Sequence, residues 1–78
     1  MTKQQVLVGV LEEFFSESQI DYILSLLYSW TGNYDDVENW LHSPIPAFGY
    51  ISAIEACNRG LASEVISYIS GIEQGGYA

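Results

Sequence analysis

Basic side chains are scarce in this chain. Its 78 residues include only two Lys or Arg, Lys3 and Arg59, against ten Asp and Glu, so the formal net charge is −8. Proteins that bind nucleic acid neutralise phosphates with many basic side chains. The composition therefore argues against direct nucleic-acid binding and against binding to an anionic membrane surface. It favours a partner that is neutral or basic.

Cysteine and histidine are nearly absent. Cys57 and His42 are the only residues of their types. One cysteine excludes an intrachain disulfide framework, and one cysteine with one histidine cannot supply a four-ligand zinc site. We therefore predict no metal and no cofactor. A lone cysteine suits a reducing compartment, and the start of the chain has no signal-peptide pattern, so we predict a cytoplasmic protein.

Long apolar runs are also missing, because no stretch approaches the ~18 consecutive apolar residues of a membrane span. Apolar residues are nevertheless abundant, at 49% of the chain, with three Phe, two Trp and six Tyr. A domain this small cannot bury all of these large side chains. We therefore expect some of them to contact a protein partner or a second copy, and we predict a homodimer or a higher oligomer.

Apolar residues recur at helical spacing in five segments, which predicts an all-α fold in one small domain. The expected helices cover residues 2–15, 18–30, 34–42, 52–59 and 62–73, so residues 1–30 hold two of them. Read locally, residues 65–69 could pass for a strand, but the spacing over the whole segment favours a helix. Gly9 either weakens the first helix or lets another helix approach closely.

Polar residues and glycines mark the helix ends. Thr2 and Asn33 are suitable N-caps, and Ser52 with Glu55 fits a capping box. The second helix can start either with Ser16 and Gln19 or with Ser18 and Asp21. Glycines follow the second and fourth helices, as expected at helix C-termini.

A proline- and glycine-containing segment separates the third helix from the fourth. We call it the elbow. Proline disfavours helix in the residue before it, and glycine permits a turn. We expect the elbow to be structural and to aim the last two helices; it is defined by Trp40, Leu41, Pro44, Pro46, Gly49 and Ser52.

No group of residues has the pattern of a catalytic site. His42 lacks a recognisable nucleophile and an orienting carboxylate, and Cys57 is expected to be a buried, inert thiol. The acidic cluster at residues 35–38 lacks the spacing of an EF-hand, and the glycines form no phosphate-binding loop. We predict that the protein is not an enzyme and has no catalytic, cofactor-binding or metal-binding residues.

The order of turn and apolar residues from residue 36 onward resembles the toxin-binding domain of Xre/MbcA/ParS-type antitoxins. The resemblance covers the C-terminal half of the chain. Two departures are evident: Ser52 stands where many family members have proline, and the helix-turn-helix that commonly binds DNA is missing. The matching residues are Trp40, Leu41, Pro44, Pro46, Phe48, Gly49, Ile54, Glu55, Ala56, Gly60, Val65, Ile69, Ile72, Glu73 and Gly75.

The resemblance implies an all-helical, self-associating domain that neutralises a RES-type, NAD-consuming toxin. In that family the C-terminal portion occupies the entrance of the toxin's active site. Residues 33–78 would then be the toxin-binding segment, with a flexible tail over residues 74–78. The partner-binding residues carried over are Ile72, Glu73, Gln74, Gly75, Gly76 and Tyr77.

These observations favour a small acidic interaction module of bacterial or phage origin that inhibits a protein partner as an antitoxin does. Two alternatives remain open. The ten carboxylates could mimic nucleic acid and block a basic groove, as in an acidic inhibitor of a phage or plasmid. The protein could instead be a structural homodimer without an inhibitory role.

Overall fold

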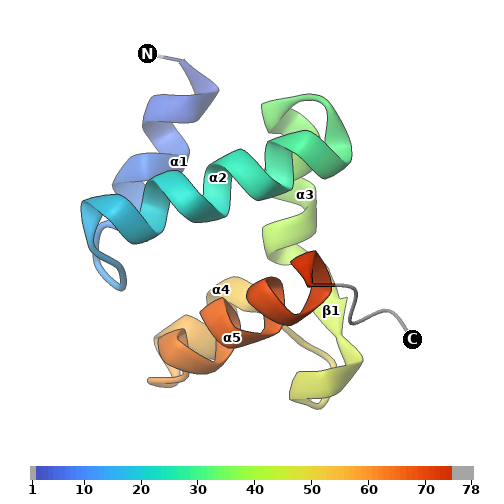
Figure 1. Cartoon of the computed structure of the whole chain (residues 1–78). Helices are drawn as coiled ribbons and strands as arrows, with labels where there is room; N and C mark the ends of the chain where they lie inside the picture. Colours follow the sequence, from blue (N-terminus) through green and yellow to red (C-terminus); the bar gives the residue numbers. More distant parts are fainter. Residues whose placement is uncertain (1, 75–78) are drawn as a thin grey trace.

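Five α-helices and one short strand pair make up residues 2–74, the part of the chain that the computed structural model describes (Figure 1). The all-α, single-domain fold predicted from the sequence is confirmed. The helices α3 and α5 have the predicted bounds. The five helices are α1 (Lys3–Leu11), α2 (Glu17–Thr31), α3 (Tyr34–His42), α4 (Ala53–Asn58) and α5 (Ala62–Glu73).

Side-chain caps fix where α1, α2 and α3 begin. The Thr2 hydroxyl accepts a hydrogen bond from the Gln5 backbone N–H, and the Gln5 side chain accepts one from Thr2. Ser16 forms the same reciprocal box with Gln19, so this cap, of the two that the sequence offered, starts α2. Asn33 caps α3. Each cap satisfies backbone N–H groups that have no partner within the helix.

The prediction for the end of the first helix is wrong. The helix was expected to reach residue 15, but α1 ends at Leu11. The backbone N–H groups of Phe14 and Phe15 both donate to the Leu11 carbonyl, at 3.0 Å each, and so close a turn. The extended backbone of Ser16 then redirects the chain into α2, and Phe15 is buried under the turn. The apolar periodicity continued to Phe14, but the Ser16 capping box overrides it.

The elbow folds into a small hairpin that the sequence did not predict. Strand β1 (Pro44–Ile45) pairs antiparallel with β2 (Ile51–Ser52), with Ile45 opposite Ile51. Between them lies the 3₁₀ turn η1 (Pro46–Phe48), followed by Gly49 at φ 75° and Tyr50 at φ 70°. The ring of Phe48 packs on Tyr68 of α5, with centroids 5.4 Å apart. The elbow is therefore attached directly to the last helix.

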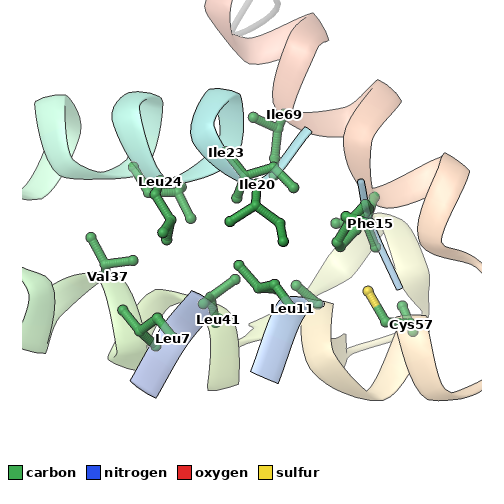
Figure 2. Close-up of a cluster of buried hydrophobic side chains, with 14 of the residues drawn as sticks. Leu7, Leu11, Phe15, Ile20, Ile23, Leu24, Val37, Leu41, Cys57 and Ile69 are labelled. Atoms are coloured by element: carbon green, nitrogen blue, oxygen red, sulfur yellow. The ribbon is translucent and has the colours of Figure 1, made fainter. Parts of the chain in front are cut away.

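The core is apolar throughout the described residues and receives side chains from every α-helix (Figure 2). Neighbouring helices pack in pairs, α2 on α3 and α4 on α5, and α5 returns to contact α2. The short helix α4 contributes only small side chains, Ala53, Ala56 and Cys57. The larger core residues are Leu7, Leu11, Phe15, Ile20, Ile23, Leu24, Leu27, Val37, Leu41, Ile45, Val65 and Ile69.

Gly9 gives the first testable prediction. It lies within α1 and is exposed, and among residues 2–74 no atom beyond its own stretch of helix lies within 4 Å of the place where a Cβ would stand, so none of the other described helices approaches it closely. We expect Gly9→Ala to raise the free energy of unfolding, measured in urea, by about 0.5–1 kcal/mol, because alanine loses less backbone entropy on folding. Gly32→Ala is the control: at φ 89° a side chain is strained, so stability should fall. A neutral or destabilising Gly9→Ala would contradict this reasoning.

Candidate functional site

The end of α5 carries the described part of the predicted partner-binding segment. Ile72 is half-buried, and Glu73 is exposed at the last position of the helix. The Tyr22 hydroxyl of α2 donates a hydrogen bond of 2.7 Å to Glu73 Oε1. Gln74 is the C-cap residue that follows α5, and its backbone N–H donates to the Ser70 carbonyl. The other predicted residues, Gly75, Gly76 and Tyr77, lie outside the described residues.

A groove of about 630 Å³ opens beside this helix end. We call it the tryptophan groove, because both tryptophans of the chain line it. Trp30 comes from α2 and Trp40 from α3, and their rings meet edge to face with centroids 6.4 Å apart and planes at 63°. In Figure 1 the red end of α5 lies next to the lower end of α3. The lining residues are Leu26, Ser29, Trp30, Thr31, Trp40, Ile72 and Glu73.

The structure thus joins residues that the sequence placed in two separate groups. Trp40 was assigned to the elbow, yet its side chain lines the groove together with Ile72 and Glu73. The rest of the elbow lies outside the groove. Leu41 is in the core, and Ser52 caps α4 by accepting a hydrogen bond from the Glu55 backbone N–H. Pro44, Pro46 and Gly49 shape the hairpin between them.

None of the residues that α2 contributes to the groove was among the predicted site residues. Trp30 continues the helical spacing of the apolar residues of α2, but its side chain is 38% exposed. Leu26 and Tyr22 are half-buried. These two residues widen the apolar face beyond a single stripe, which is typical of a helix contacted on two sides. The width of this apolar face is the one sequence feature that points to a second contact surface on α2. The pairing of Trp30 with Trp40 depends on the tertiary fold.

Both basic side chains are engaged by carboxylates of the chain itself. Lys3 Nζ lies 2.8 Å from Glu38 Oε1, and the same interaction raises the pKa of Lys3 and lowers that of Glu38. Lys3 also lies 3.6 Å from an oxygen of Asp35. Arg59 pairs with Glu55 one turn earlier in the chain. Among residues 2–74, neither Lys3 nor Arg59 therefore forms an ion pair with Glu73.

The described residues contain no group of His, Cys, Asp and Glu that could hold a metal ion. His42 is exposed at the end of α3. Cys57 is buried within the core, and burial raises the pKa of its thiol to about 11. A thiol of such high pKa carries little thiolate near neutral pH, so it is a poor nucleophile. Neither His42 nor Cys57 lines the tryptophan groove.

Cys57 also predicts a pH dependence of stability. Its pKa rises from 9.0 to about 11 on burial, so the unfolded chain loses this proton at lower pH than the folded chain. The stabilising contribution is complete below about pH 9 and is lost as the pH rises toward about 11. We expect the free energy of unfolding to fall by on the order of 2 kcal/mol over this range. Urea titrations of Cys57→Ala, which retains the other titrating groups, should lack this decrease; coincident pH profiles would contradict it.

No described helix is both long and apolar enough to cross a membrane. Comparison of the chain with protein-family models, curated proteins and solved structures finds no match.

Proposed function

We propose that this chain is a small acidic protein-binding module that inhibits its partner, and that the partner docks on the tryptophan groove and the end of α5. The groove is the observation that carries the proposal. Tryptophan is enriched among the residues that dominate protein–protein binding energy. Here two of them meet on the surface beside the segment that sequence resemblance assigned to the partner, through Ile72 and Glu73.

The charge of the chain supports a basic partner. The net charge is −8, and both basic side chains face carboxylates within the domain. A protein with this field associates faster with a partner of opposite charge. The resemblance to antitoxin domains supplies a candidate of that kind, a RES-type toxin with a site for anionic NAD.

The test uses a purified RES-type toxin and follows its consumption of NAD. We expect the intact chain to suppress NAD consumption at stoichiometric amounts. A variant that lacks residues 73–78 should keep its helical circular dichroism spectrum and lose inhibition. If the shortened chain still inhibits, the C-terminal segment is not the docking element; if the intact chain has no effect, the inhibitor proposal fails.

Two aromatic variants locate the docking surface. Trp30→Ala should lose inhibition, because it removes one wall of the tryptophan groove. Tyr50→Ala is the matched control, since Tyr50 is 71% exposed in the elbow and does not line the groove. Equal losses in both variants would contradict docking at the groove. Competition of the complex by DNA, together with steep salt dependence, would favour the nucleic-acid mimic instead.

Self-association and a cytoplasmic location remain parts of the proposal. Val6 and Val10 lie one turn apart on α1 and are 38% and 40% exposed, so a second copy could cover them. Size-exclusion chromatography with light scattering tests this surface: the dimer should become a monomer in the Val6→Lys, Val10→Lys double variant. A monomeric parent chain at micromolar concentration would contradict self-association. The single buried thiol of Cys57 suits a reducing compartment.

A further inference from the structure

The tryptophan groove lies where three helices end. Apart from Leu26, every lining residue belongs to the last three residues of its helix. Ser29, Trp30 and Thr31 end α2; Trp40 is in the last turn of α3; Ile72 and Glu73 end α5. The C-terminal ends of α2 and α3 therefore meet the C-terminal end of α5, which lies more than 30 residues later in the sequence.

Helix C-termini carry partial negative charge, because the last carbonyls have no partner within the helix. Neither α2 nor α5 has a basic residue in its last turn to offset this charge, and His42, in the last turn of α3, does not line the groove. Glu73 adds a full negative charge, and neither Lys3 nor Arg59 pairs with it among the described residues. The polar part of the groove therefore favours a cation.

The aromatic part favours the same kind of ligand. The faces of an indole ring are negative, and tryptophan is the best aromatic partner for a cation. Trp30 and Trp40 meet edge to face, at an interplanar angle of 63°. In this arrangement the ring that presents its edge keeps its own faces uncovered by the other ring. A flat cation can lie against such a face, and the carboxylate of Glu73 lines the same groove.

We propose that the tryptophan groove binds an arginine side chain of the partner protein. The planar guanidinium group stacks on one indole face and donates hydrogen bonds to Glu73 and to carbonyls at the helix ends. The bond from Tyr22 to Glu73 Oε1 holds the carboxylate in position and leaves its other oxygen to accept. Lysine would match the charge but not the planar stacking. This inference rests on the proposed docking of a partner at the groove.

The experiment uses the intact chain and its own fluorescence. Both tryptophans line the groove, so tryptophan emission reports directly on its occupancy. The probes are blocked Leu-X-Leu peptides in which X is arginine, its neutral analogue citrulline, lysine or trimethyl-lysine. We expect the arginine peptide to bind at least about tenfold more tightly than the citrulline peptide, because only arginine carries the charge.

Two glutamate variants separate a local contact from the general field of the protein. Glu73→Gln should weaken binding of the arginine peptide about tenfold, because it removes the charge within the groove. Glu64→Gln makes the same change in the first turn of α5, outside the groove, and should alter binding less than about twofold because exposed distant charges are screened. Trp30→Leu should abolish the preference for arginine over lysine.

Four results would overturn the inference. These are equal binding of the citrulline peptide, equal losses in Glu73→Gln and Glu64→Gln, an arginine preference that survives Trp30→Leu, or tighter binding of the lysine or trimethyl-lysine peptide. The NAD assay keeps this test distinct from the proposed function. If the chain inhibits the toxin but shows no arginine preference, only the inference fails. If the arginine peptide binds but the toxin is not inhibited, the proposed function fails, whereas arginine binding in the groove is supported.

Discussion

Leu27→Ala is expected to lower the free energy of unfolding by about 3–5 kcal/mol. Leu27 lies in the middle of the core, is 0% exposed, and sits on α2, which packs against both α3 and α5. Truncation to alanine removes buried methyl groups and leaves a cavity that the surrounding helices cannot fully close. A domain of this length has a total stability of only about 4–12 kcal/mol, so the variant should lose a large share of it.

The neighbouring residue provides a matched control. Leu26 is the same residue type on the same helix, but it is half-buried and lines the tryptophan groove. We expect Leu26→Ala to cost less than about 1.5 kcal/mol, because part of its surface is already in water. Urea denaturation followed by circular dichroism measures both variants. Similar losses at the two positions would mean that the groove is part of the core rather than a surface.

Ala56→Leu is expected to cost about 2–3 kcal/mol through overpacking. Ala56 is 0% exposed on α4, a helix that packs against both α3 and α5. Its carbonyl also accepts the Leu61 backbone N–H at 2.9 Å, which closes the turn into α5. A larger side chain would push α4 away from its neighbours and disturb this turn.

The control for this variant is Ala47→Leu, which adds the same atoms to an exposed position in η1. It should change the midpoint of thermal unfolding little. Ala56→Leu should lower the midpoint by roughly 10 °C or more, since each kcal/mol corresponds to about 4–8 °C in a domain of this size. A small shift in both variants would show that the interior beneath α4 has spare room.

The bounds of a helix are predictable where capping residues or prolines mark its ends. Asn33 fixes the start of α3, and the prolines after His42 fix its end, so its predicted bounds match the structure. The end of α1 was wrong, because apolar periodicity continued past the point where the Ser16 cap begins the next helix. The β1–β2 pair escaped prediction because two residues per strand are too few to show an alternating pattern.

The candidate site was predictable only in part, for a different physical reason. Ile72 and Glu73 were predicted as partner-binding residues by resemblance, and both line the tryptophan groove. The groove itself depends on tertiary packing: α2 on α3 places Trp30 and Trp40 in edge-to-face contact, and the return of α5 to α2 brings the end of α5 beside them. Helical spacing describes one helix at a time, so it cannot reveal which two helix ends meet.

The hydrogen bond between Tyr22 and Glu73 bears on the order of folding. It joins residues 51 positions apart, whereas α2 with α3 and α4 with α5 are sequence neighbours. Local pairs form quickly, and distant contacts require closure of a long loop. We therefore expect the contacts between helices that are neighbours in the sequence to form first and α5 to close on α2 last. The contact between α5 and α2 would then be the first to open in the native state. A partner bound in the groove contacts both helices, so it would oppose this opening and raise the free energy of unfolding.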